Sequence, residues 1–354
     1  MKKTALVVVA AFAGLGLVGC GSEDSKNAST TTVELAEFCE SAAATGSITV
    51  YSGRSETLVA DFFTEFEAAS NIDIDVRYGD SAELAGQILT EGSATPADVF
   101  FSQDAGALGA LANADLLAEL PASILDRVGE QFRSSESKWV GTSGRVRVVV
   151  YNPEIVSAPP TNIDSLLDPQ WKGKIGFAPT NASWQSFVTA LRVIRGDDAA
   201  RKWLEGFSDN EPVAYEKNSA VRDAVNAGQV SIGLVNHYYL YELIAAEGEA
   251  AVVAKNQFMD NGDVGGLVNV AGMGVLAGSD SAALGQCLVA FALSDAGQNY
   301  FVERSYEYPL VEGIAQYEGL PAFDELNPPA LDLSDLESLD ATQELLADVG
   351  LLTD

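Results

Sequence analysis

The chain has 354 residues, with 51 acidic against 20 basic side chains, and its formal net charge of −31 argues against nucleic acid and anionic membrane surfaces as ligands. It contains one histidine and three cysteines, and it lacks a Cys-x-x-Cys pair, a His-Glu-x-x-His motif and a Walker-type glycine loop. Any metal binding or chemistry must therefore use oxygen donors: phenolates, carboxylates or an imported anion.

The first residues predict an exported protein. Lys2 and Lys3 precede an apolar run at 6–18, which is typical of a secretory signal and too short for a comfortable transmembrane helix. The run ends in Gly19-Cys20, which resembles a bacterial lipobox, so we expect a signal peptide at 1–19 and a lipid on Cys20; the alternative is a plain signal peptide with an incidental cysteine. The predicted location is extracytoplasmic, in the periplasm or on the outer face of the cytoplasmic membrane, with the lipid as the only membrane contact.

Residues 20–45 are rich in small polar side chains near their start, and we interpret them as a flexible tether and N-terminal extension. Cys39 and Cys287 are the cysteines that remain beyond Cys20. Export places them in a compartment that permits disulfides, so they either pair with each other or persist as two buried free thiols.

The chain then alternates predicted strands and helices. In the first half, strands are expected at 47–51, 72–78 and 98–102, with helices at 56–69 and 82–89 between them. This β-α-β-α-β order favours a largely parallel sheet with sites at the carboxyl ends of its strands.

The same alternation returns in the second half, and the length suits two α/β lobes. Strands are predicted at 145–151, 175–178, 229–235 and 274–277, with a glycine-marked loop and crossover at 262–272 before the last of them. Helices are predicted at 183–194, at 198–207 with Asp198 as the N-cap, and from about 334 to 349.

The most informative segment is Asn236-His237-Tyr238-Tyr239-Leu240-Tyr241, which follows the predicted strand at 229–235 and so lies at a strand's carboxyl end. Phenolate is a hard, charged ligand, and hard ligands suit small, highly charged cations such as ferric iron. The alternative is an amphipathic aromatic turn that packs on the core, because clustered aromatics commonly serve packing.

Several short motifs stand in order between residues 46 and 352. They are Val50-Tyr51-Ser52-Gly53-Arg54, Tyr78-Gly79-Asp80-Ser81-Ala82-Glu83-Leu84-Ala85, Thr95-Pro96-Ala97-Asp98-Val99-Phe100, Ser143-Gly144-Arg145-Val146-Arg147-Val148, Lys217-Asn218-Ser219, Asn236-His237-Tyr238-Tyr239 and Glu307-Tyr308-Pro309-Leu310. Each motif is weak alone, but together they closely resemble the ferric-ion substrate-binding proteins of ABC importers.

The resemblance implies an α/β, bilobal type II periplasmic-binding-protein fold, with mixed, mostly parallel sheets joined by hinge strands. Lobe 1 would comprise 46–145 plus 267–318, and lobe 2 would comprise 146–266 plus 319–354. The implied function is capture of Fe(III) with a synergistic carbonate or phosphate in the cleft between the lobes, and delivery to an ABC permease by a monomer that is not an enzyme.

By position, Tyr238 and Tyr239 match the adjacent tyrosines that ligate iron in that family. The residues that fall where the family binds its anion are Asn181, Ala182, Ser183, Asn218 and Asn236. Their position implies anion binding, and backbone N–H groups at a helix start suit that task.

The chain also departs from the family. Ser55 stands where some members place a histidine ligand, Ala82 stands where some place a glutamate, and Glu83 stands where those members use a glutamine to help bind the anion. Ser183 and Trp184 lie where other members add a tyrosine. Only two protein ligands of the iron therefore carry over, so an exogenous anion must supply more of its coordination.

The cations available to hold that anion are Arg54, Arg145 and Arg147, because arginine pairs with planar oxyanions bidentately; the alternative is ordinary surface or interlobe pairing. His237 could support the tyrosine pair or ligate the metal, although the aligned position is not a family ligand and a lone histidine here is commonly just hydrogen-bonded. Tyr241 is expected to pack or to support the pair, and Tyr51 to lie in the core.

Two other functions remain open at this stage. The same fold could bind another ligand: a ferric chelate, an organic anion or a polyamine. A secreted hydrolase would have to use His237 in its catalytic triad, and the chain has no Gly-x-Ser-x-Gly elbow.

Overall fold

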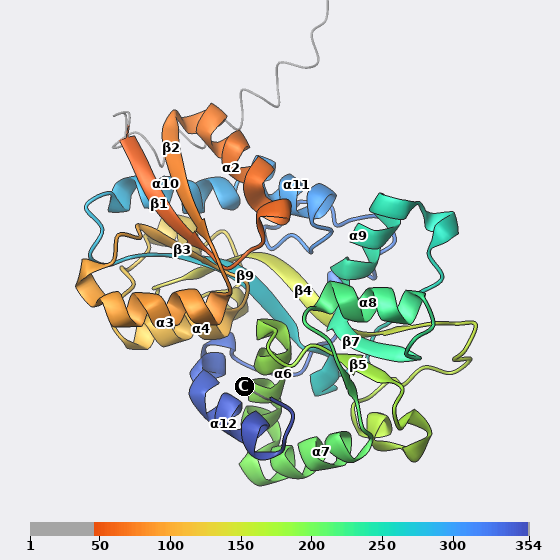
Figure 1. The fold of residues 1–354 in the computed structure, drawn as a ribbon. Helices are drawn as coiled ribbons and strands as arrows, with labels where there is room; N and C mark the ends of the chain where they lie inside the picture. The colour runs from red at the N-terminus through yellow and green to blue at the C-terminus, as the bar shows by residue number, and fades with distance from the viewer. Residues whose placement is uncertain (1–45, 353–354) are drawn as a thin grey trace, which may run out of the picture.

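The computed structural model describes residues 46–352, which form two α/β lobes (Figure 1). The predicted signal peptide, the lipidated Cys20, the tether at 20–45 and Cys39 all lie outside the described residues. Cys287 is buried and disulfide-bonded, and its pairing with Cys39 remains a prediction. Within residues 46–352, none of the helices combines the length and apolar character that a membrane span requires.

Lobe 1 is built on three parallel strands in the order β2-β1-β3. They are β1 (Gly46–Ser52), β2 (Ile72–Tyr78) and β3 (Val99–Ser102). The helices are α2 (Glu56–Ser70), α3 (Ser81–Glu91), α4 (Ala105–Asn113), α5 (Ala122–Leu125), α10 (Ala282–Ala292) and α11 (Asp295–Arg304). Phe62 of α2 packs its ring 5.2 Å from Phe301 of α11 and 5.3 Å from Phe291 of α10, so aromatic packing joins helices far apart in the chain.

The loops that follow β1, β2 and β3 meet at one edge of lobe 1. The Gly53 N–H donates to Phe101 O at 2.8 Å, and the Gln103 N–H donates to Ser81 Oγ at 2.8 Å. A Cβ on Gly53 would lie 2.0 Å from Ser81 Oγ, so only glycine permits this approach. The loops are therefore positioned as one unit.

Lobe 2 has a second parallel set of strands in the order β7-β5-β6. These strands are β5 (Ile175–Phe177), β6 (Val213–Ala214) and β7 (Ile232–Asn236), with the short β8 (Lys255–Gln257) antiparallel to β4. The helices are α6 (Ala182–Arg195), α7 (Asp197–Asp209), α8 (Asn218–Asn226), α9 (Tyr238–Glu247) and α12 (Leu339–Asp348).

Two antiparallel strands connect the lobes: β4 (Val140–Tyr151) and β9 (Val268–Val275). The first part of β4 pairs with β9, and its second part pairs with β7, with Arg147 opposite Asn236. Both strands cross the middle of the molecule in Figure 1. The parallel strands predicted from the sequence are thus confirmed within each lobe, and antiparallel strands join them.

The sequence prediction was wrong at several places. The strand expected at 145–151 begins earlier, at Val140, and the strand expected at 229–235 begins later, at Ile232. The strand expected at 274–277 is β9, which ends at Val275 and contains Gly272 rather than following it as a loop. A Cβ on Gly272 would lie 2.7 Å from Val140 O, so this glycine permits close approach of β4 and does not break the strand. Asp198 is not the N-cap of α7, because Gly196, at φ 82°, turns the chain between α6 and α7 and places Asp198 in the first helical turn.

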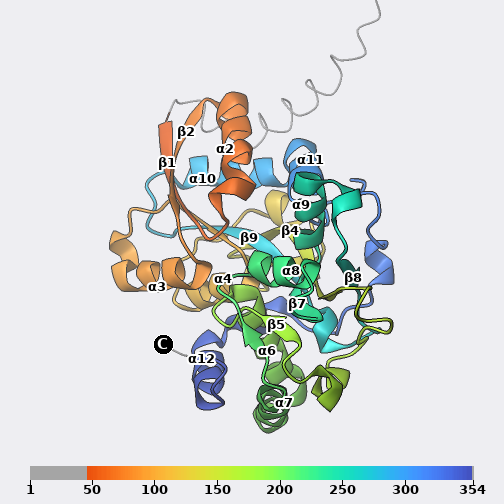
Figure 2. The ribbon, with the colours of Figure 1, turned by 45° about the vertical axis from the view of Figure 1, so that its right-hand side comes forward.

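The C-terminal segment contacts both lobes. Helix α12 lies beside α6 in both ribbon views (Figures 1 and 2), and Thr342 Oγ1 lies 2.7 Å from Thr189 Oγ1 of α6. The short helical turn at Leu333–Glu337 packs against α4 of lobe 1, where Leu336 O would lie 2.7 Å from a Cβ on Gly106. The predicted last helix is therefore a short turn followed by α12.

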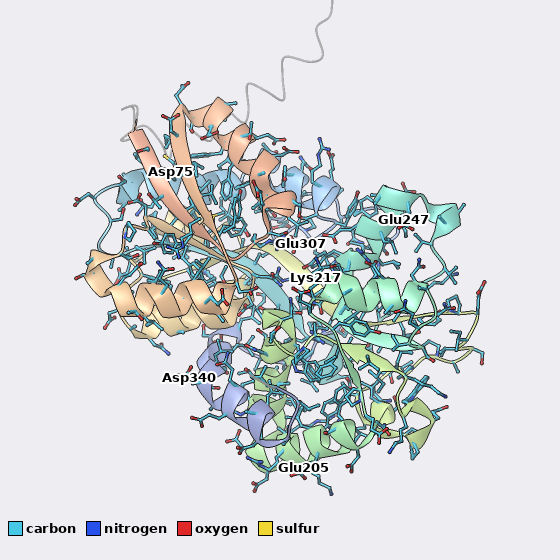
Figure 3. The ribbon with its side chains drawn as sticks, in the orientation of Figure 1. Asp75, Glu205, Lys217, Glu247, Glu307 and Asp340 are labelled. Atoms are coloured by element: carbon cyan, nitrogen blue, oxygen red, sulfur yellow. The ribbon has the colours of Figure 1, made fainter. Side chains whose placement is uncertain are left out.

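A buried ion cluster lies where the lobes meet. Glu307, labelled near the centre of Figure 3, accepts from Arg54 Nη1 at 2.7 Å and Nη2 at 2.9 Å, and from Arg145 Nη1 at 3.3 Å. Ser143 Oγ and Ser305 Oγ add hydrogen bonds at 2.9 and 3.1 Å. Burial would raise the pKa of the Glu307 carboxyl, but Arg54 and Arg145 outweigh burial and hold that pKa below its usual value.

His237 links three segments at the same place. Its Nδ1 accepts the Val146 N–H of β4 at 3.2 Å, and its Nε2 donates to the carbonyl of Tyr306 at 2.9 Å. The ring is fully buried, and burial lowers its pKa to about 4, although the hydrogen bond to Tyr306 O opposes that shift. His237 is therefore a neutral structural bridge with both ring nitrogens engaged.

Replacing Glu307 by glutamine leaves two buried guanidinium groups without a charged partner. We expect Glu307→Gln to lower the free energy of unfolding by about 3–5 kcal/mol, measured by urea denaturation. The same change at the exposed Glu312 is the control and should stay within about 0.5 kcal/mol of the parent protein. A loss at Glu307 as small as that of the control would contradict the role given to the cluster.

The depressed pKa of His237 makes stability depend on pH. The unfolded chain takes up this proton near pH 6.5 but the folded chain only near pH 4, so stability is lost as the pH falls through this window, by up to about 3 kcal/mol. We expect the stability difference between the parent and His237→Gln to shrink by that amount from pH 7 to pH 4 in urea titrations. Carboxylates shared by both proteins cancel in the comparison, so a difference that is constant with pH would refute it.

Candidate metal centre

The tyrosine pair lies at the carboxyl end of β7, as predicted. The chain leaves the sheet at Asn236, His237 is the residue before α9, and Tyr238 and Tyr239 are the first residues of that helix. Their rings stack with centroids 4.3 Å apart at an interplanar angle of 30°. Tyr238 is 1% exposed, whereas Tyr239 is partly exposed and reaches the cleft wall.

Both phenols are neutral at physiological pH. Burial raises the pKa of Tyr238 well above 10, and the neighbouring Tyr239 raises it further, while Arg145 and Arg54 oppose. Burial also raises the pKa of Tyr239, against hydrogen bonds from Tyr238 and Asn218 that favour its ionised form. Only a highly charged cation can therefore displace these protons and use the pair as phenolates.

A polar cluster lies beside the pair, where two helices begin. Asn181, the N-cap of α6, accepts on Oδ1 from Ser183 N–H at 3.0 Å, Ser183 Oγ at 2.7 Å and Asn218 Nδ2 at 3.0 Å. Asn218 opens α8 and is buried, and its Oδ1 has no hydrogen-bond partner among the described residues. Three donors thus converge on one neutral oxygen at helix N-termini that favour negative charge.

The three predicted arginines occupy different surroundings. Arg54 donates both terminal nitrogens to Glu307, and Arg145 shares that carboxylate but keeps a buried Nη2 without a partner among the described residues. Arg147 donates to Ser183 O at 2.8 Å and lies over the Phe187 ring at 5.1 Å. Burial lowers the pKa of Arg147 to about 9, against the influence of Tyr239. Arg147 is thus the arginine nearest to the polar cluster at α6.

The remaining predicted residues are spread more widely. Ser55 faces the cleft from lobe 1, whereas the exposed Glu83 of α3 is not among the residues that line it. Tyr241 donates its hydroxyl to Gly319 O at 3.1 Å and packs its ring 5.5 Å from that of Tyr317. The phenol of Tyr241 thus contacts the segment at 305–320 that follows α11, which we call the second crossing. Tyr51 is buried in lobe 1, as expected.

A cleft of about 730 Å³ opens beside Tyr239. Its lining residues come from both lobes and from the second crossing: Ser55, Thr57, Leu58, Gln103, Asn181, Lys217, Ser219, Arg222, Tyr239, Glu242, Ala245, Ala246, Arg304 and Tyr306. Lys217 and Glu307 are labelled near the centre of Figure 3, between the lobes.

Sequence reasoning missed Arg222, Glu242 and Arg304 as cleft residues. Arg222 donates to Tyr239 O at 2.8 Å and so supports the pair from α8. The spacing Tyr239-x-x-Glu242 on a predicted helix was the available signal for Glu242, because residues three apart share a helix face. Arg222 and Arg304 had no such signal, because they come from elements distant in the chain.

The donor types at the cleft limit which metal the site can hold. Among residues 46–352, no group of three or more histidine, cysteine, aspartate or glutamate side chains could hold a metal. The tyrosine oxygens that reach the cleft are hard donors, which suit a hard, highly charged cation.

Comparison with known proteins places these features in a family. The sequence profile of the bacterial extracellular solute-binding proteins matches residues 94–329. The Fe(3+)-binding periplasmic protein of Serratia marcescens is 34% identical over 321 residues, which is 90% of this chain and 94% of the relative.

Solved structures agree. Iron-bound HitA from Pseudomonas aeruginosa superposes with a TM-score of 0.82 at 34% identity, covering 86% of this chain and 99% of HitA. The Trichodesmium protein IdiA (FutA), in complex with iron and citrate, has a TM-score of 0.73 at 28% identity, covering 87% and 100%. These likenesses confirm the predicted bilobal fold, and the chain belongs to the bacterial extracellular solute-binding proteins, among relatives that bind ferric iron in the periplasm.

Proposed function

We propose that this protein captures Fe(III) together with a synergistic anion in the cleft between its lobes and delivers it to an ABC permease. The observation that carries the proposal is the stacked pair Tyr238 and Tyr239, of which Tyr239 lines the cleft, beside a cluster of donors at two helix N-termini. The ferric-iron-binding relatives support it.

In this proposal Tyr238 and Tyr239 bind iron as phenolates. The two guanidinium groups of Arg54 and Arg145 share the single carboxylate of Glu307, so this buried cluster carries a surplus of one positive charge. That surplus favours ionisation of the Tyr238 phenol, whose pKa burial alone would raise further. Arg54 and Arg145 thus act on the phenolates, and Arg145 Nη2 remains available to an anion.

The anion binds at the start of α6. A carbonate or phosphate oxygen takes the place that Asn181 Oδ1 now fills for Ser183 and Asn218, and the backbone at Ala182 and Ser183 adds helix N–H groups. Asn236 ends β7, and Arg147 lies opposite it within β4, where the two are paired in register. Since the tyrosines supply only two protein donors, the anion completes much of the coordination.

Lobe 1, at 46–145 plus 267–318, closes over lobe 2, at 146–266 plus 319–354, by bending at β4, β9 and the second crossing. Ser55 and Gln103 line the cleft from lobe 1. The closed monomer, held at the membrane by a lipid on Cys20, is the form that the permease recognises. Its role is binding and not catalysis, and differential contacts in the liganded state are sufficient to favour closure.

A ferric chelate is the second candidate ligand, because the cleft is large and cationic. Its volume of about 730 Å³ exceeds the need of one ion and a small anion, and Lys217, Arg222 and Arg304 line it. Those side chains suit a polycarboxylate that accompanies the iron, and the Trichodesmium relative holds iron with citrate.

Ferric iron should give a visible phenolate-to-iron charge-transfer band. We expect the band when ferric ion is added to apo protein with carbonate or phosphate, and we expect Tyr238→Phe and Tyr239→Phe each to weaken iron binding tenfold or more, since each removes a charged donor. The measurement is a spectrophotometric titration, repeated with citrate to test the chelate.

Tyr241→Phe is the matched control for this titration, because Tyr241 lies on the same helix but donates to Gly319 O. It should keep the band and the affinity of the parent protein. Absence of a band with every anion would show that the fold serves another ligand, and a band that survives in the double variant Tyr238→Phe/Tyr239→Phe would place the iron elsewhere.

The anion site can be blocked with a single charge. We expect Asn181→Asp to satisfy the same three donors with a carboxylate and to repel an incoming anion, so the phosphate or carbonate concentration needed for half of the band rises at least tenfold. Asn71→Asp adds the same charge at the exposed end of α2 and should change nothing. If the band showed the same dependence on anion concentration in both variants, the anion would not bind at the start of α6.

A further inference from the structure

Glu242 occupies the same face of α9 as the tyrosine pair. It lies three residues after Tyr239 and four after Tyr238, which is the spacing of neighbours on a helix surface. The same face continues with Ala245 and Ala246, and the cleft lining contains Tyr239, Glu242 and both alanines. The Glu242 carboxylate is therefore carried by the same rigid element that presents the phenols.

The carboxylate of Glu242 is shielded but poorly satisfied. Its side chain is 23% exposed, and its ion-pair partner is Arg222 Nη1 at 3.6 Å, beyond hydrogen-bonding distance. Arg222 is already engaged by Asp223 at 2.7 Å and by Tyr239 O at 2.8 Å. Among the residues that the structure describes, no donor forms a hydrogen bond to the Glu242 carboxylate, although carboxylates in shielded places usually have such partners.

The tyrosine pair needs a further anionic oxygen donor. Two phenolates leave most of the coordination of ferric iron unfilled. The polar side chains that lobe 1 contributes to the cleft, Ser55, Thr57 and Gln103, are neutral, and the exposed Glu83 is not among the cleft residues. A carboxylate oxygen is a hard donor like phenolate, and it suits the same cation. We propose that Glu242 is a third protein ligand of the Fe(III) bound by Tyr238 and Tyr239.

This inference rests on the proposed function, because it assigns a donor to the same metal. It also predicts that replacing the Glu242 carboxylate changes the visible spectrum of the iron-loaded protein. When a neutral amide replaces an anionic carboxylate at ferric iron, the metal becomes a stronger electron acceptor, so the phenolate-to-iron band moves to longer wavelength. A residue that only supports the fold or attracts iron from a distance leaves the wavelength unchanged.

The test compares Glu242→Gln with Glu247→Gln on the same helix. Glutamine has the shape of glutamate, and the bonds of Arg222 to Asp223 and to Tyr239 O remain, so the tyrosines keep their positions. Glu247 is exposed and is labelled at the outer part of α9 in Figure 3, away from Glu307 and Lys217 at the centre. Both variants change the net charge equally.

Ferric ion and phosphate are the probes, and band position and iron affinity are the readouts, with thermal unfolding of each apo protein as the folding check. We expect Glu242→Gln to shift the band to longer wavelength and to weaken iron binding at least tenfold, with Glu247→Gln unchanged in both. An unshifted band in Glu242→Gln overturns the assignment, whether or not affinity falls, and leaves the proposed function standing. A parent protein without any band refutes the proposed function itself.

Discussion

The interaction on which the rest of the structure depends is the buried contact of Arg54 and Arg145 with Glu307. It joins the loop after β1, the crossing strand β4 and the second crossing after α11, which are three segments from distant parts of the chain. Burying these charges costs several kcal/mol per ion, and the geometry repays this only because the carboxylate receives two arginines and two serine hydroxyls.

The same cluster supplies the electrostatic background of the tyrosine pair. Two guanidinium groups on one carboxylate leave positive charge beneath Tyr238, yet burial keeps both phenols protonated in the apo protein. The two phenols thus stay protonated unless a bound cation stabilises the phenolates. In the proposed function a highly charged cation would have to displace both protons, so the burial that raises these pKa values would disfavour weakly charged ions.

Much of the fold could be predicted because local pattern and tertiary role agree. The period-two alternation of β2 and the aromatic face of α2 each indicate that one side of the element is buried. Both elements begin and end within one residue of their predicted bounds. One error occurred where a glycine serves a tertiary contact. The local sequence around Gly272 is typical of a loop, but this residue lies inside β9. Its lack of a side chain allows β4 to pack closely against it.

The sequence by itself determined the oxygen-only donor chemistry, the position of Tyr238 and Tyr239 at a strand's end and the family to which the chain belongs, because these depend on residue types, short motifs and local spacing. Only the tertiary structure decided that His237 is a neutral bridge, that Arg54 is committed to Glu307, and that Arg222 and Glu242 face the cleft. The physical reason is that these partners lie far apart in the chain, by 253 residues for Arg54 and Glu307. No local sequence pattern encodes which distant group will form the hydrogen bond or ion pair that a buried polar group needs.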